Sequence, residues 1–343
     1  MRAFRTCLPV KALNSPTRKL RFDWPISRLT ISPKKKNRPC PRPLAALSTL
    51  KLKKHWPQRG ANQQMAGARA ELDSDSPIGS HRARFWQKLI WQICDWHPLP
   101  QKWRQKLRKR YARKVVGPFD ITHDDMRFRL YPSENYCDRV LFGRDELPEK
   151  TEHEALLDVL KPGMVFVDIG ANVGTYSIFV SAKLGGDCTI LAMEPHPRTY
   201  QKLQFNLQAN GISIGSAHNV GVGPSRGKIE LWSDGGSNIG HTSMVKGGTS
   251  NPKVSHEVDI VPLMDLLREN SISAIDVLKI DIEGFEDQAL APFFDTAEEA
   301  VWPRHILIEI AHQNLWQRDL LAMLDARGYA ERFRTKENRL LSL

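Results

Sequence analysis

The ten residues 165–174, VFVDIGANVG, constrain the fold of this chain more than any other stretch. The apolar run at 165–167 is typical of a buried parallel strand. Small residues follow Asp168, and the apolar, helix-like segment TYSIFVSAKL comes directly after them. A strand, a glycine-rich turn and a helix bring backbone N–H groups to a nucleotide-like ligand. A side chain at Gly170 or Gly174 would fill the space that the ligand needs, which explains why both positions are glycine.

The composition of this turn indicates the class of ligand. Dinucleotide-binding turns read G-x-G-x-x-G, whereas this one reads D-x-G-x-N-x-G, from Asp168 through Asn172. A carboxylate here would repel a pyrophosphate but suits an amino group or a sulfonium, and S-adenosylmethionine carries both. Glu194 ends the next apolar strand, in ILAMEPHP, where an acid accepts hydrogen bonds from ribose hydroxyls. The predicted cofactor site is therefore Asp168, Gly170, Asn172, Gly174 and Glu194. The alternative is a doubly wound turn that binds no cofactor.

The positive charge of the chain is confined to one end. The formal net charge is +12, but residues 1–70 hold 17 Lys and Arg with only one acid, Asp23, so the remainder is net acidic. The net positive charge of the chain therefore gives no reason to expect nucleic acid as a partner of the nucleotide-binding domain. Five scattered cysteines without a C-x-x-C pair indicate neither a zinc site nor a disulfide framework, and they favour a cytoplasmic location.

Residues 1–80 are predicted to be a disordered basic tail, because pieces such as SPKKKNRPCPRP can bury little apolar surface. Their composition would also fit an organelle transit peptide, a nucleic-acid arm, or translation from upstream of a start at Met65. No apolar run approaches the roughly 20 residues needed to cross a bilayer.

Residues 81–116 are predicted to form two basic amphipathic helices, separated by Pro98 and Pro100. In the first, apolar residues recur at helical spacing: Phe85, Trp86, Leu89, Ile90, Ile93 and Cys94. One interpretation is a surface that docks on a membrane or on a partner. The other is a helical cap that packs on the main domain with its basic side in solvent.

Residues 117–343 are predicted to be one doubly wound α/β domain. After a hairpin near 119–130 and a helix at 151–160, strands and helices alternate. The segments GKIELWS and VSHEVDIVP look like an antiparallel pair, joined by a Gly/Ser-rich loop that contains His241. Two short C-terminal strands, YAERF and NRLLSL, predict an antiparallel edge on a Rossmann-like sheet.

Polar residues follow the predicted strands at their carboxyl ends, where parallel sheets bind ligands. Lys279, Asp281 and Glu283 in LKIDIEG would share one side of the sheet if the strand continued that far. Glu309 and His312 end the next strand. Methyl transfer to an alcohol gains from a nearby base, and Asp281, His241 and His312 are candidates. Asp281 and Glu283 alone are few ligands for a divalent metal, so none is assigned.

Several of these motifs together resemble the FkbM family of S-adenosylmethionine-dependent methyltransferases. They are VFVDIGANVGTYSIF, AMEPHPRTYQKLQFNLQANG, VGVGPSRGKIELW and VLKIDIEGFEDQAL, in this order within 136–343. The resemblance implies the seven-stranded class I methyltransferase sheet and O-methylation of a hydroxyl on a sugar, glycan, lipid-linked sugar or secondary metabolite. It also implies that Asp281 and Glu283 face the reacting groups. Val222-Gly223-Pro224 departs from the family pattern, in which a polar residue often lies near the adenine.

Two other functions compete with this expectation. A nicotinamide enzyme with the same fold is disfavoured by Asp168 in the turn. A non-catalytic adaptor, with basic helices at a membrane and a degenerate nucleotide-binding domain, would not need the set of Asp168, Gly170, Gly174, Glu194 and Asp281. Methylation of nucleic-acid amines would call for an N-P-P-Y type strand end, which KIDIEG is not.

Overall fold

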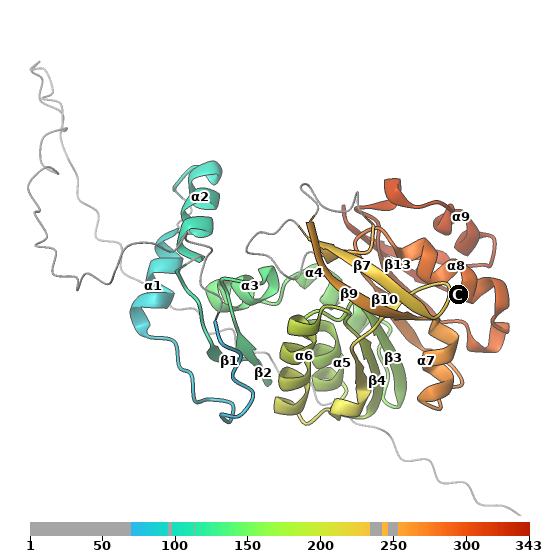
Figure 1. Cartoon of the computed structure of the whole chain (residues 1–343), viewed down its shortest axis with the longest axis horizontal. Coiled ribbons are helices and arrows are strands. Elements are labelled where there is room, and N and C mark those ends of the chain that lie inside the picture. Colours follow the sequence, from blue (N-terminus) through green and yellow to red (C-terminus); the bar gives the residue numbers. More distant parts are fainter. Residues whose placement is uncertain (1–69, 95–97, 113, 234–241, 246–252) are drawn as a thin grey trace, which may run out of the picture. The chain divides into compact units, whose positions relative to one another are not determined.

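The computed structural model describes residues 70–343 except 95–97, 113, 234–241 and 246–252 (Figure 1). The N-terminal part of this range contains two helices, a hairpin and two further helices. They are α1 (Phe85–Cys94), α2 (Gln101–Ala112), β1 (Phe119–His123), β2 (Met126–Leu130), α3 (Tyr136–Arg144) and α4 (Lys150–Leu157). The predicted hairpin is confirmed, with Phe119 opposite Leu130, but it forms a separate two-stranded sheet.

A seven-stranded sheet forms the centre of the chain. Its strands are β3 (Met164–Ile169), β4 (Cys188–Met193), β5 (Ala217–His218), β10 (Val277–Ile280), β11 (His305–Glu309), β12 (Ala330–Arg334) and β13 (Asn338–Ser342). The order is β12-β13-β11-β10-β3-β4-β5. The strands from β11 to β5 are parallel, and β13 runs antiparallel between β11 and β12. This arrangement confirms the predicted Rossmann-like sheet with an antiparallel C-terminal edge.

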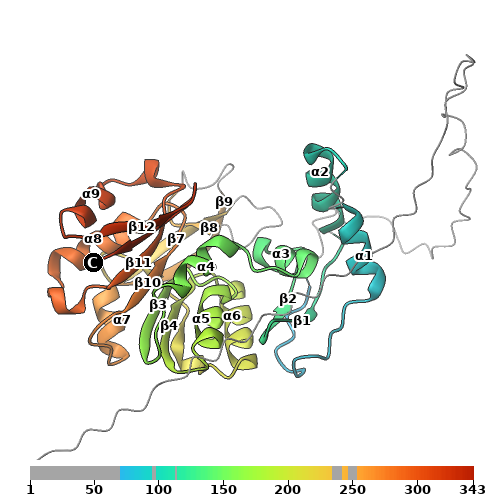
Figure 2. The same ribbon diagram turned by 180° about the vertical axis from the view of Figure 1, so that it is seen from behind.

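Helices cover both faces of this sheet (Figures 1 and 2). They are α5 (Thr175–Lys183), α6 (Pro197–Ala209), α7 (Leu263–Glu269), α8 (Glu286–Thr296) and α9 (Leu320–Asp325), with short 3-10 turns at Ile214–Ser216, Glu299–Val301 and Gln313–Leu315. Successive strand residues point to opposite faces, so Phe166 packs in the core beneath α4, α5 and α6. Val167 packs in the other core, beneath α7, α8 and α9.

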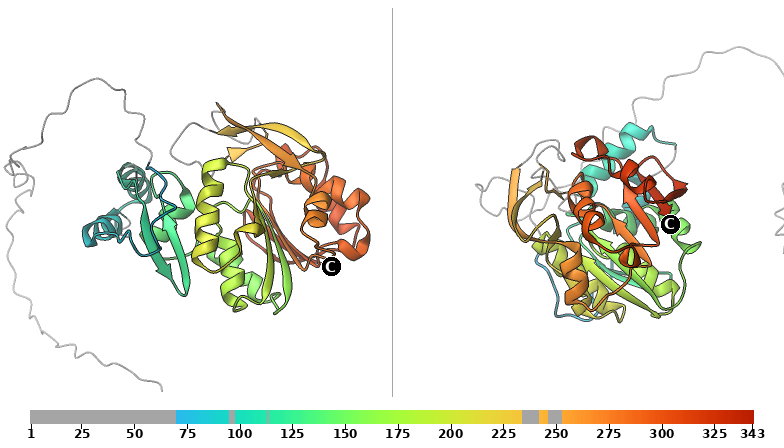
Figure 3. Two further views of the ribbon diagram at one scale, coloured as in Figure 1. Left: turned by 60° about the horizontal axis from the view of Figure 1, so that its bottom comes forward. Right: turned by 90° about the vertical axis from the view of Figure 1, so that its right-hand side faces the viewer.

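A second sheet lies beside the main one (Figure 3). It contains β6 (Gly221–Val222), β7 (Gly227–Ser233), β8 (Thr242–Ser243) and β9 (Lys253–Val261) in the order β6-β9-β7-β8. The predicted pairing of the segments at β7 and β9 is confirmed as antiparallel. Residues 217–222 are divided between the two sheets, because β5 joins the main sheet and β6 joins this one.

The segment before α1 contacts the hairpin. Arg129 is 1% exposed, and its guanidinium donates to the carbonyl oxygens of Asp73, Ser76 and Pro77 and to the Asp120 carboxylate. Residues 70–80, which we expected to belong to a disordered tail, are therefore held against β1 and β2. Residues 1–69 of that expected tail lie outside the described residues. Among the helices that the structure describes, none has the length and apolar character to cross a membrane.

Candidate functional site

A cavity of about 390 Å³ opens at the carboxyl ends of the central parallel strands. The turn after β3, the end of β4 and the residues after β10 and β11 all line it. The first turn of α3 and the second sheet supply the other walls, through Cys137, Leu231 and Met244 among others. Parallel α/β sheets bind their ligands at this edge, because the strands diverge there and helix N-termini point toward it.

The glycine-rich turn is shaped by contacts inside the protein. Gly170 has a φ of 78°, and a Cβ placed on it would lie 2.0 Å from the carbonyl oxygen of Asp281. A Cβ on Gly174 (φ 90°) would lie 2.9 Å from a methyl carbon of Leu203. We expected side chains at these positions to occupy the space of the ligand. That reason is wrong for both glycines, because neighbouring protein atoms already occupy the space.

Asp168 lies beneath the turn and does not line the cavity. Its carboxylate is fully buried, accepts a hydrogen bond from Ser177 Oγ at 2.7 Å and lies 3.6 Å from Lys279 Nζ. Burial tends to lower the pKa of Lys279, but the charges of Asp281, Asp168 and Glu149 outweigh it and raise that pKa. Lys279 Nζ also donates to the carbonyl oxygen of Gly170 at 2.8 Å. Asp168 therefore supports the turn through Lys279, in place of the direct ligand contact that we expected.

Glu194 and Asn172 do line the cavity. Glu194 Oε2 accepts from the backbone N–H of Asn172 at 3.0 Å, and Oε1 accepts from that of His196 at 2.9 Å. Burial raises the pKa of Glu194 to about 7, although these two hydrogen bonds act in the opposite direction. Each oxygen keeps a second lone pair, so the carboxylate can still accept from a ligand hydroxyl. This geometry fits the predicted contact with a ribose.

Asp281 and Glu283 also line the cavity. The strand β10 ends at Ile280, so the condition under which Lys279, Asp281 and Glu283 would share one side of the sheet is not met. Glu283 instead has a left-handed backbone with a φ of 57°, and its carbonyl oxygen accepts from Ser243 Oγ at 2.6 Å. His241, the third predicted catalytic residue, lies outside the described residues.

Glu283 meets two residues from the end of β11. His312 Nδ1 lies 3.2 Å from Glu283 Oε2 and 3.4 Å from Glu309 Oε1. Burial, and then the charge of Asp281, raise the pKa of both glutamates above the ordinary range. Glu283, Glu309 and His312 each offer one ligand atom within 4.8 Å of the others, so these three could hold a divalent cation.

Sequence analysis did not predict that residues of α3 and of the turn before α4 line the cavity. The turn before α4 contributes Glu149, whose Oε2 accepts from Tyr176 Oη at 2.6 Å and whose pKa burial raises to about 7. Asn135 caps α3 by accepting from the N–H of Cys137, and its amide donates to Asn172 Oδ1 at 2.6 Å. The side chain of Asn135 thus ties α3 to the turn. An N-cap signature at Asn135 was readable in the sequence, but its partner was not.

Carboxyl groups dominate the cavity lining. Six acids contribute to it, Glu149, Glu194, Asp281, Glu283, Glu309 and Glu337, and among the described residues no lysine or arginine lines it. Lys279 lies behind the turn with its charge directed at Asp168 and Asp281. Such a lining favours a cationic ligand and repels a diphosphate.

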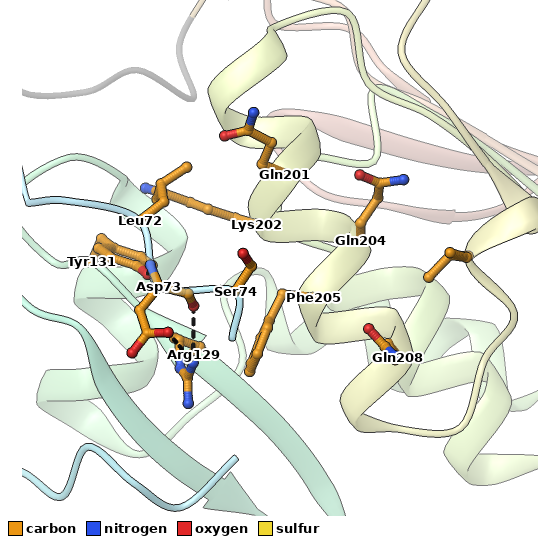
Figure 4. Close-up of a pocket in the computed structure, with 11 residues that line it drawn as sticks. Leu72, Asp73, Ser74, Arg129, Tyr131, Gln201, Lys202, Gln204, Phe205 and Gln208 are labelled. Atoms are coloured by element: carbon orange, nitrogen blue, oxygen red, sulfur yellow. Dashed lines mark hydrogen bonds and ion pairs between the residues drawn. The ribbon is translucent and has the colours of Figure 1, made fainter. Parts of the chain in front are cut away.

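A second cavity of about 360 Å³ lies between residues 72–74, β2 and α6 (Figure 4). Its cations already have partners inside the protein. Arg129 pairs with Asp120, and Lys202 Nζ lies 2.9 Å from Glu134 Oε2 and 3.7 Å from Asp138 Oδ2. This cavity therefore has no vacant charge for a ligand and lies away from the strand ends.

The family described as "Methyltransferase FkbM domain" matches residues 168–330, from the glycine-rich turn to the antiparallel edge. Residues 168–330 therefore form a methyltransferase FkbM domain. The match covers the residues after β10 and β11 that line the acidic cavity, but not α1, α2 or the hairpin.

Two relatives illustrate what this chain is similar to. It is 27% identical over 198 residues to the "31-O-demethyl-FK506 methyltransferase FkbM" of Streptomyces tacrolimicus, a match that covers 50% of this chain and 74% of the relative. It is 25% identical over 183 residues to the "Hexuronic acid methyltransferase AglP" of Haloferax volcanii, covering 53% and 70%.

Among solved structures, the methyltransferase FkbM of Methylobacillus flagellatus KT matches with a TM-score of 0.37 and 17% identity. That match covers 74% of this chain and 58% of the other, so this chain spans little more than half the length of that protein.

Proposed function

We propose that this chain transfers the methyl group of S-adenosylmethionine to a hydroxyl oxygen of a sugar, a glycan, a lipid-linked sugar or a secondary metabolite. The observation that carries the proposal is the acidic cavity at the strand ends, with Glu194 at the tip of β4. The names of the two relatives support it, since one name specifies a 31-O-demethyl compound as the substrate and the other specifies a hexuronic acid.

The residues of the cavity fit this cofactor. In the proposal, the Glu194 carboxylate accepts hydrogen bonds from the ribose hydroxyls, and the turn from Gly170 to Asn172 lies against the rest of the nucleoside. The surrounding carboxylates favour a ligand with an ammonium and a sulfonium group. When bound, the cofactor supplies a methyl group activated by the positive sulfur.

Asp281 is the proposed base. Its side chain is 30% exposed at the cavity wall, and its Oδ2 lies 3.8 Å from Lys279 Nζ. Asp281 would take the proton of the acceptor hydroxyl while the oxygen bonds to the methyl carbon, the carbon–sulfur bond breaks and the sulfur leaves as the thioether of S-adenosylhomocysteine. Burial and the charge of Asp281 raise the pKa values of Glu283 and Glu309, and in its protonated form either carboxyl can donate a hydrogen bond to the acceptor.

A nicotinamide coenzyme fits this lining poorly. Its pyrophosphate would enter a cavity lined by six acids, and the described lining offers it no basic side chain. A non-catalytic adaptor is the other alternative, and it would have no use for a carboxylate poised at Asp281. We also propose a cytoplasmic location, which the free thiols of Cys137 and Cys188 support.

Transfer of a labelled methyl group from S-adenosylmethionine to hydroxyl-bearing acceptors tests this proposal. Mass spectrometry of the product identifies the methylated atom. We expect Asp281→Asn to lower kcat about 10²- to 10³-fold while cofactor affinity changes only a few-fold. Glu298→Gln, which alters an exposed acid away from the cavity, serves as the control and should keep most of the activity. A product methylated on nitrogen or carbon would contradict the proposal.

A further inference from the structure

The helix α1 presents an apolar face to solvent. Phe85, Trp86 and Ile93 are 73%, 62% and 55% exposed, and Leu89 and Ile90 are also exposed. These five residues, which we call the α1 apolar face, lie at positions i, i+1, i+4, i+5 and i+8 and so share one side of the helix. Exposed apolar side chains of this size, gathered on one side, mark an interaction surface.

The opposite side of α1 is anchored to the methyltransferase domain. Trp91 is 3% exposed and packs edge-on against Phe142 of α3, with ring centroids 6.1 Å apart. A Cβ on Gly143 would lie 1.8 Å from Trp91 Nε1, so the indole packs against α3 at the position where that helix has no side chain. Cys94 is buried on the same side. The predicted cap and the predicted surface helix thus describe two sides of one helix, and the anchored side holds the α1 apolar face outward.

Basic residues surround this face. On α2, Trp103 is 62% exposed, Leu107 is exposed one turn later, and Lys106 Nζ lies 5.9 Å from the centroid of the Trp103 ring. The exposed basic side chains of the two helices and their flanks are Arg82, Arg84, Lys88, Lys102, Lys106, Arg110 and Lys114. In the sequence, Asp95 is the one acid within residues 82–116. The surface therefore combines aromatic and aliphatic side chains with a nearly uniform positive charge.

We propose that α1 and α2 dock this protein on an anionic lipid surface, with the α1 apolar face inserted at the level of the headgroups. Aromatic residues beside lysine and arginine on a helix too short to span a bilayer are typical of helices that lie in the interface. The basic side chains supply attraction to anionic headgroups, worth roughly fivefold in affinity for each residue near the surface.

Charge argues against two other occupants of this face. Residues 1–70 hold 17 Lys and Arg and a single acid, so that segment would meet like charges on α2. A second copy of the chain would bring the same basic surface against itself. An acidic protein partner is compatible with the charge alone, and the experiment below separates it from lipid.

Sedimentation of the full-length chain with vesicles tests the proposal. We expect binding to vesicles of phosphatidylcholine with about one third phosphatidylglycerol, little binding to phosphatidylcholine alone, and weakening as salt is raised. Trp86→Glu/Ile93→Glu and, separately, Lys102→Glu/Lys106→Glu should each weaken binding about tenfold or more. All four side chains are exposed, so both variants should melt like the parent chain.

Matched controls come from other exposed positions. Ile214→Glu, half-exposed on a 3-10 turn, and Lys161→Glu, exposed before β3, should bind vesicles like the parent chain. Absence of binding to the anionic vesicles would overturn the proposal, as would equal loss in the controls. A concentration-dependent dimer that Trp86→Glu/Ile93→Glu abolishes, seen by analytical ultracentrifugation without lipid, would also overturn it and assign the face to a second copy. None of these outcomes depends on methyl transfer.

Discussion

Lys279 Nζ donates a hydrogen bond to the carbonyl oxygen of Gly170 and so joins β10 to the turn after β3. The same ammonium lies 3.6 Å from Asp168 and 3.8 Å from Asp281. The buried ammonium of Lys279 thus holds the turn, and its positive charge lies close to the carboxylates of Asp168 and of the proposed base, Asp281.

Replacing this cation should destabilise the protein. We expect Lys279→Met to cost about 3–5 kcal/mol, because the buried Asp168 carboxylate loses its counter-charge. Urea unfolding followed by fluorescence measures this cost, with the exposed Lys161→Met as the control. A change below about 1 kcal/mol would show that the ion pair is not what stabilises the turn.

Gly170 and Gly163 provide a matched pair of substitutions. Both have positive φ, 78° and 81°, but a Cβ on Gly163 would have no heavy atom within 4 Å, whereas one on Gly170 would overlap the Asp281 carbonyl. Gly163→Ala should cost about 1 kcal/mol of stability from the backbone alone. Gly170→Ala should cost about 2–4 kcal/mol and displace Asp281, which would lower kcat as well. Thermal melts and turnover measure both, and equal costs would refute the close approach.

Cofactor affinity should depend on pH through Glu194. Its pKa in the folded chain, about 7, is raised above the ordinary value, and the ionised carboxylate accepts hydrogen bonds from ribose hydroxyls more strongly than the protonated form does. Affinity should therefore rise as pH increases from 6 to 8. Glutamine cannot ionise, so in Glu194→Gln the increase in cofactor affinity that comes from this residue should vanish. In Glu149→Gln the increase in affinity with pH should remain. Titrations at fixed ionic strength across this range check the prediction, and an unchanged profile in Glu194→Gln would contradict it.

Glu194 should make the free energy of unfolding fall as pH rises, whereas it makes cofactor affinity increase. Because the folded pKa of Glu194 lies above the unfolded one, the folded state binds more protons between about pH 4.5 and 7. Its contribution to stability is present below the unfolded pKa and falls as pH rises through 7. In Glu194→Gln, unfolding free energy should decline less over this window than in the parent chain. Denaturant titrations at pH 5 and pH 7.5 measure the difference.

Activity should survive removal of divalent cations. Glu283, Glu309 and His312 could hold one, but the proposal assigns proton removal to Asp281 alone. We expect turnover in EDTA to lie within about twofold of turnover in magnesium, because the general-base step needs no Lewis acid. Loss of activity in EDTA, restored by Mg²⁺ or Mn²⁺ and absent in His312→Ala, would assign the reaction to a metal at these three residues.

The sequence predicted those parts of the site that local pattern determines. Asn172 and Glu194 could be placed because a strand, a turn and the tip of the next strand follow one another closely. Glu149 could not, because its place in the lining depends on how α4 packs against Tyr176, 27 residues later. Asp168 was placed in the cavity because the pattern does not tell which way a side chain turns, and burial beside Lys279 decided it.

The same limit applies to α1. The spacing of its apolar residues correctly predicted a helix, but not which side of it is buried. Trp91 packs against α3 because Gly143 leaves room for the indole, a complementarity between elements some 50 residues apart. Helical periodicity identifies an apolar face, whereas only the neighbouring elements determine whether that face has anything to pack against.

The most direct test of the central claim is calorimetric titration of the chain with S-adenosylmethionine, beside Glu194→Ala and beside NAD⁺. The account predicts saturable binding of S-adenosylmethionine below millimolar concentration, affinity lowered about tenfold or more by Glu194→Ala, and no binding of NAD⁺. Binding of NAD⁺, or S-adenosylmethionine affinity that Glu194→Ala leaves unchanged, would contradict it.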